Sequence, residues 1–222
     1  MSSQAALQED CRRPIVPMTV ASNVENRRKN TMAEESNVHV KVAMADVMAL
    51  FVIAFFTFLV GGLGLGVFDQ PAILASIAVP VGILVLVATI ITYLNENVLG
   101  TAIFGPLAVF FLVFPFIPAD SAGMLALVYI GLVMLIDTVL SLAQPVRLLP
   151  IVLLIAALAF FVTGLWYDGG ATDATIRTAA GVLWMVFSLL GMYLATGIVL
   201  LVMKGKQVVP IGIPSAPAAS KA

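Results

Sequence analysis

Residues 71–95 form a long uncharged stretch and read PAILASIAVPVGILVLVATIITYLN. A bilayer core of about 30 Å is crossed by about 20 apolar residues in a helix. The stretch is long enough, and it lacks the polar–apolar alternation of a membrane barrel strand. Because backbone groups in lipid must bond within their own segment, the pattern predicts a transmembrane α-helix.

Five further stretches have similar length and composition. They cover residues 47–67, 97–119, 121–146, 148–167 and 178–203. Asp137 is the one charged residue in these stretches, and short links rich in Gly, Pro, Asn and Asp separate them. The sequence therefore predicts an all-α fold, a bundle of six transmembrane helices in the cell membrane.

The distribution of charge also indicates a body surrounded by lipid. Hydrophobic residues make up 61% of the 222 residues and charged residues only 10%, against about 25% charged residues in soluble domains. The net charge is −1 without a basic stripe, which argues against nucleic-acid binding. Cys11 and His39, the single cysteine and histidine, precede the first span. We therefore expect no metal site, no cofactor and no enzymatic machinery in the membrane body.

Basic residues predict the orientation. Ten Lys and Arg residues fall on the side of the two termini and only Arg177 on the other, so the positive-inside rule places both termini in the cytoplasm. We expect a disordered cytoplasmic tail over residues 1–42, a six-helix domain over 43–204 and a short cytoplasmic tail over 205–222. Residues 1–30 lack the apolar core of a cleavable secretory signal.

Asp137 is the polar residue most informative about function. A carboxylate deep in a span costs at least about 2.5 kcal/mol, so it should face the bundle interior or be protonated. Ser141 and Gln144 follow one and two turns later, and a helix would place all three on one face. This face indicates either an interhelical hydrogen bond or a site for ion- or proton-coupled movement.

Prolines, glycines and one further aspartate also lie in the spans. Pro80 and Pro106 are expected to interrupt the second and third spans, as ordinary kinks or as breaks that line a pathway. Gly62 and Gly66 form a small-xxx-small pair that permits close helix packing. Asp46 stands where the first span begins and is expected to act as its N-cap.

Several motifs resemble the acetate uptake transporters, the succinate–acetate permease type. The spacing Tyr93-x3-Asn97-x2-Gly100-x3-Phe104 is similar to a motif of that family. The last span contains the run from Tyr193 to Leu200, which is similar to the start of the family's last-helix signature. The sequence Gly-Lys-Gln-Val-Val-Pro-Ile-Gly at 205–212 resembles its closing motif, and Val-Tyr-Ile-Gly-Leu at 128–132 resembles its fourth span.

The chain departs from the family at polar positions. Its first-helix motif Asn-Pro-Ala-Pro-Leu-Gly is here Asp46 to Phe51, with only Leu50 identical. Two family glutamates correspond to Thr92 and Ile198, and a third-helix tyrosine corresponds to Leu107. The resemblance implies a homo-oligomer, a hexamer of six-helix protomers, each of which moves acetate or a related small acid.

The leading hypothesis is a transporter or channel for small monocarboxylates, moved as the protonated acid or together with a proton. In this hypothesis Phe55 and Phe104 narrow the pathway, and Tyr93 and Asn97 shape its cytoplasmic mouth. Asp137 is the titrating group. Tyr193 is the sixth pathway residue, assigned from the last-helix signature.

Two alternatives stay open. One is a passive pore for neutral solutes such as urea or short amides. The other is a membrane scaffold or sensor that acts through its N-terminal tail, in which Arg27, Arg28 and Lys29 are the notable residues.

Overall fold

The computed structural model describes residues 45–212, and all regular structure within that range is helical. Six helices in this range are long and apolar enough to cross a membrane. They are Ala45–Gly64, which we call the first helix, α2 (Pro71–Leu94), α3 (Val98–Val113) with the 3-10 turn η2 (Phe114–Phe116), α4 (Ser121–Ser141), α5 (Leu148–Asp168) and α6 (Ala174–Lys204). The prediction of an all-α bundle with six spans is confirmed. The expected tail over residues 1–42 and the last residues of the expected C-terminal tail lie outside the described range.

Polar residues in the links determine where several helices begin and end. Asp120 accepts hydrogen bonds from the amides of Ala122 (2.9 Å) and Gly123 (3.1 Å) and so caps α4. Asp173 does the same for α6, which begins at Ala174 rather than at the expected residue 178. Side-chain oxygens are needed there because the first amides of a helix have no partner within the helix.

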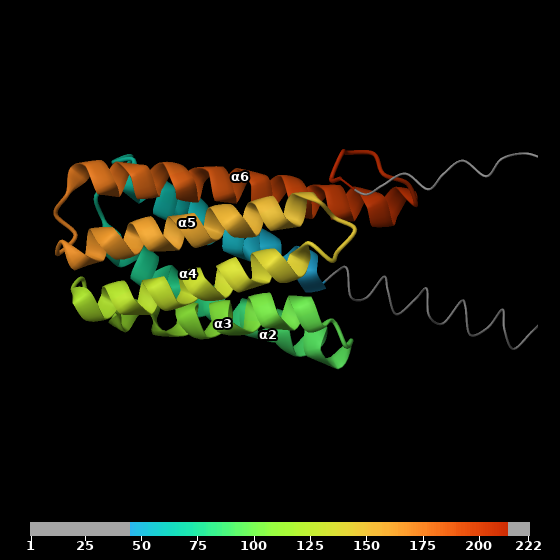
Figure 1. Ribbon diagram of the computed structural model, residues 1–222, viewed down its shortest axis with the longest axis horizontal. Helices are drawn as coiled ribbons and strands as arrows, with labels where there is room; N and C mark the ends of the chain where they lie inside the picture. Colours follow the sequence, from blue (N-terminus) through green and yellow to red (C-terminus); the bar gives the residue numbers. More distant parts are fainter. Residues whose placement is uncertain (1–44, 213–222) are drawn as a thin grey trace, which may run out of the picture. The chain divides into compact units, whose positions relative to one another are not determined.

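Helix packing follows the chain order closely. α2 packs on α3, α3 on α4, α4 on α5 and α5 on α6. Figure 1 shows α4, α5 and α6 side by side, with the start of the first helix and the end of α6 at the same end of the bundle. We call this the Asp46 end and the opposite end, which holds the link between α5 and α6, the Arg177 end.

The first helix lies against α6 through glycines. A Cβ added at Gly181 would lie 2.7 Å from the carbonyl carbon of Gly64, and one added at Gly61 would lie 3.0 Å from the amide nitrogen of Met185. The expected Gly62–Gly66 pair is not the one used: Gly62 faces Phe68, and Gly66 lies in the turn after the helix with φ of 73°. Small residues at a crossing let two backbones approach closely, and here Gly61, Gly64 and Gly181 serve that purpose.

The prolines do not break their helices, so the expected pathway-lining breaks are absent at Pro80 and Pro106. α2 continues through Pro80 and α3 through Pro106. The break in the third span comes later, where Pro115 lies in the turn η2. α4 also ends at Ser141, so Gln144 lies in the following link and not on the helical face of Asp137.

Candidate solute pathway

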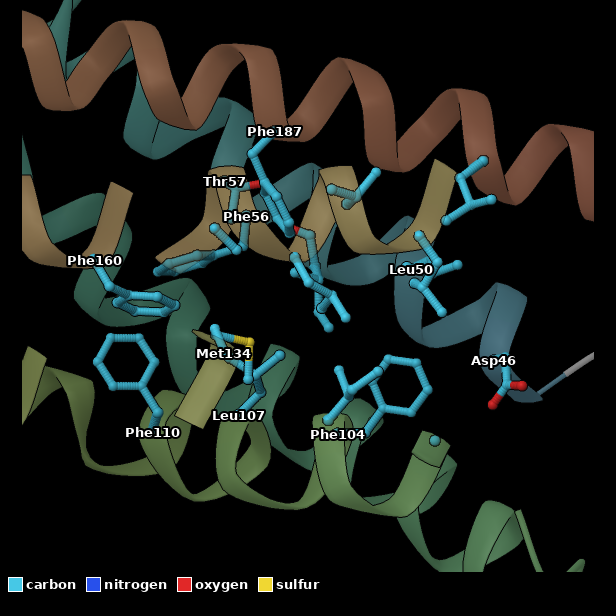
Figure 2. Close-up of a pocket in the computed structure, with 18 of the residues that line it drawn as sticks. Asp46, Leu50, Phe56, Thr57, Phe104, Leu107, Phe110, Met134, Phe160 and Phe187 are labelled. Atoms are coloured by element: carbon cyan, nitrogen blue, oxygen red, sulfur yellow. The ribbon is translucent and has the colours of Figure 1, made fainter. Parts of the chain in front are cut away.

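A central cavity of about 200 Å³ lies inside the bundle. Side chains of the first helix and of α3 to α6 line it, and most of them are aliphatic or aromatic. Figure 2 shows Asp46 at one edge of this cavity, with Phe110 and Phe160 toward the other end and Met134 and Leu107 between them. The cavity therefore runs from a polar rim at the Asp46 end into an apolar interior.

Asp46 and Asn97 form the polar rim. The Asn97 amide donates a 2.9 Å hydrogen bond to Asp46 Oδ2. Its own Oδ1 accepts from the amide of Gly100 at 3.0 Å, which caps α3. Asp46 Oδ1 is buried without a hydrogen-bond partner in the described part of the chain. Asp46 is itself helical and not the N-cap residue that was expected, and the structure gives it a tertiary contact with Asn97.

The interior of the central cavity offers few free polar atoms. The Thr57 hydroxyl donates to the carbonyl oxygens of Ile53 (2.9 Å) and Ala54 (3.2 Å) of its own helix. Aromatic rings that line the cavity pack edge to face on one another. The ring centres of Phe56 and Phe111 are 5.0 Å apart, and those of Phe110 and Phe160 are 5.1 Å apart. A solute inside would thus lose most of its hydration without receiving a charged partner.

A second cavity of about 580 Å³ lies at the Arg177 end. The Arg177 guanidinium donates to the Leu63 carbonyl oxygen through Nε (3.1 Å) and Nη2 (2.6 Å), and Nη2 also pairs with Asp69 at 2.8 Å. Trp166 and Tyr167 line the same cavity. The hydrogen bonds to Leu63 tie the end of the first helix to the start of α6, and the ion pair ties the following link to it.

Four side chains line both cavities and so separate them: Val60, Phe114, Thr163 and Trp184. Trp184 Nε1 donates a 2.9 Å hydrogen bond to Thr163 Oγ1, and the Thr163 hydroxyl donates to the Ala159 carbonyl oxygen at 2.7 Å. The indole ring also packs edge to face on Phe160, 4.8 Å away between centres. We call these four side chains the partition.

The structure brings together only some of the residues predicted for the pathway. Asn97 and Phe104 line the central cavity. Phe55 and Tyr93 do not line either cavity, and their side chains are 53% and 71% exposed. Phe56, the neighbour of Phe55, lines the cavity instead, because adjacent residues point to different sides of a helix.

Tyr193 and Asp137 lie away from the cavity linings. The Tyr193 hydroxyl donates to the Pro210 carbonyl oxygen at 3.2 Å, which holds the chain after α6 against that helix. Asp137 is only 3% exposed, and its Oδ2 has no hydrogen-bond partner among the described residues. It follows Met134, a lining residue of the central cavity, by about one helical turn. The structure therefore places Asp137 beside the cavity and not in its wall.

Sequence reasoning missed Phe56, Thr163, Trp184 and Arg177 as residues of the cavities. No local motif marks them, although Arg177 stood out as the lone basic residue of its side. Leu107 and Ile198, where the family resemblance expects polar or charged side chains, both line the central cavity and make it more apolar. Within residues 45–212, no three His, Cys, Asp or Glu side chains gather as metal ligands.

The six apolar spans define a multi-pass integral membrane protein. No family model and no curated protein matches the chain. Among solved structures, the fold is similar to that of the bacterial acetate channel SatP, with a TM-score of 0.70 and 23% identity over 76% of this chain and 98% of that one. The match shows that the two proteins share a fold.

Proposed function

We propose that the protein is a membrane channel or transporter that moves small monocarboxylates such as acetate. The observation that carries the proposal is the presence of two cavities in one bundle that share the partition as a common wall. Together they reach from the Asp46 end to the Arg177 end of the bundle. The similarity in fold to an acetate channel supports the same function.

The apolar wall of the central cavity favours the undissociated acid. An anion that enters loses its hydration, and the wall offers it no compensating charge. A short acid that crosses in protonated form, or together with a proton, avoids most of this cost. The aliphatic and aromatic lining residues then accommodate its methyl group.

The test is uptake of labelled acetate into proteoliposomes under a pH gradient, compared with protein-free vesicles. A156F should lower uptake by about tenfold or more, because Ala156 lines the narrow central cavity and is buried in it. L158F is the matched control on the same helix: Leu158 is exposed on the bundle surface and should tolerate the larger side chain. Uptake no faster than in empty vesicles would exclude acetate.

Proton coupling through Asp137 is part of this proposal. Its support is the burial of the carboxylate and the lack of a partner for Oδ2 in the described residues. D137N should abolish the dependence of acetate uptake on the proton gradient. Unchanged coupling in this variant would remove Asp137 from the mechanism.

A passive pore for urea or short amides is the second candidate function. Among the described lining residues no charged side chain lies inside the rim, and this favours it, since an uncharged solute needs no counter-charge there. Flux of urea or acetamide that is independent of pH and of the proton gradient would favour the pore over the coupled transporter.

Orientation and assembly belong to the same proposal. We place the Asp46 end in the cytoplasm because the basic residues gather on that side, and we propose a hexamer from the family resemblance. Cysteine labelling from each face of the membrane tests the orientation, and the mass of the purified protein in detergent tests the assembly.

The scaffold alternative involves residues outside the described range, and deletion of residues 1–40 tests it. Loss of phenotype with unchanged solute flux would support the scaffold alternative.

A further inference from the structure

Among the described residues that line the central cavity, Asp46 is the one with a charged side chain, and it lies at the rim. Its carboxylate is fixed in place, because Oδ2 accepts the hydrogen bond from Asn97 and Oδ1 packs against Gly100. A Cβ added at Gly100 would lie 3.0 Å from Oδ1. The absence of a side chain at Gly100 therefore lets the carboxylate lie against the start of α3.

No basic side chain of the described range offsets this charge in the cavity wall. Arg147, Lys204 and Lys206 belong to the same end of the bundle, but none of them lines the cavity. The Arg177 guanidinium is at the opposite end and is paired with Asp69. A carboxylate at the rim of a cavity with low-dielectric walls makes the electrostatic potential inside the cavity negative, because such walls concentrate the field.

We propose that Asp46, held by Asn97, is the anion-rejecting selectivity filter of the pathway, and that the mouth at this end admits uncharged hydrogen-bonding solutes such as undissociated short acids or primary amides. This inference rests on the proposed function for its solute class. It assigns the choice between acid and anion to one residue, at a position where the resembling family has asparagine.

A cysteine placed just inside the filter tests this without any transport measurement. Leu50 lies one turn after Asp46 on the same helix and lines the cavity. In a C11S background, the L50C thiol is reacted with a neutral and with an anionic thiosulfonate of similar size. The quantity measured is the ratio of the anionic to the neutral reaction rate, which does not depend on protein yield.

D46N should raise this ratio by about tenfold or more, the scale expected from removing one charge several ångströms from the thiol in a medium of intermediate dielectric. E96Q is the matched control, because Glu96 is an exposed carboxylate next to Asn97 that lines neither cavity. D46E keeps the charge and should keep the low ratio. D46S provides a second neutral variant if D46N does not fold.

An unchanged ratio in D46N and D46S, or an equal rise in E96Q, would overturn the proposal. So would failure of both reagents to reach L50C, since the mouth would then not be open to solutes. Because the labelling needs no flux, a filter that behaves as expected in a protein that takes up no acetate would refute the proposed function alone.

Discussion

Trp184 Nε1 and Thr163 Oγ1 are joined by a 2.9 Å hydrogen bond between α6 and α5, at the boundary between the two cavities. Both side chains are buried, and the indole ring is packed against Phe160 and Phe187. A solute that passes from one cavity to the other must displace part of the partition. The hydrogen bond is the polar contact that resists this movement.

Loss of this hydrogen bond should loosen the partition. T163V keeps the shape of the side chain and removes the acceptor. In a C11S/T57C background, a membrane-impermeant thiol reagent applied from the Arg177 end should reach the central cavity about three- to tenfold faster in T163V, the range expected from the net loss of one hydrogen bond. Labelling from the Asp46 end should not change.

T163S and T89V are the controls for this measurement. T163S retains the hydroxyl and should label as the parent does. Thr89 makes the same kind of hydrogen bond to its own helix, from Oγ1 to the Val85 carbonyl oxygen at 2.8 Å, but lies on α2 away from both cavities. Equal labelling in T163V and T89V would show that the hydrogen bond does not close the partition.

A side chain at the glycine crossing should destabilise the bundle. G181A would force its Cβ to within 2.7–2.8 Å of the Gly64 backbone, which cannot move away without separating the first helix from α6. We expect a loss of about 1–3 kcal/mol in stability. Thermal unfolding in detergent measures it.

Gly191 on the same helix is the matched control for this substitution. A Cβ there would lie 3.7 Å from the Ala54 Cβ, an ordinary contact distance. G191A should therefore be neutral or slightly stabilising, since alanine favours a helix over glycine. Equal destabilisation by both variants would contradict the importance of the Gly64–Gly181 approach.

Asn97 should stabilise α3 as well as hold Asp46. N97A removes the cap of the Gly100 amide and the donor to Asp46 Oδ2, and we expect it to cost about 1–2 kcal/mol. N95A is the control, because the Asn95 side chain makes no hydrogen bond within the described residues. A melting temperature for N97A equal to that of N95A would count against this role.

Ile211 gives the closing motif of the sequence a structural role. Its side chain is fully buried and occupies the space left by the missing side chain of Gly197, while its carbonyl oxygen accepts from the Leu148 amide at 3.4 Å. I211A should lose about 2–4 kcal/mol through the cavity it leaves. V208A, at an exposed position of the same segment, should change stability little. A small effect for both would mean that the segment is not anchored by Ile211.

The six spans, the lipid environment and many of the helix boundaries could be predicted from the amino-acid sequence. These depend on local properties: runs of apolar residues long enough for a bilayer, and short side chains such as Asp120, Asp173 and Asn97 that satisfy the first amides of a helix. The sequence also indicated Asn97 and Phe104 as pathway residues, through the spacing of a family motif. In the structure, Asn97 and Phe104 both line the central cavity.

Which face of each helix turns inward became evident from the packing of the bundle and could not be predicted from the sequence. A helix in lipid is apolar on all sides, so the contrast between polar and apolar faces that reveals the buried side of a soluble helix is missing. The sequence therefore could not distinguish Phe55 from Phe56, or Gly62 from Gly64. It also could not pair Thr163 with Trp184, or Asp46 with Asn97, because each pair joins two helices that meet only when the bundle closes.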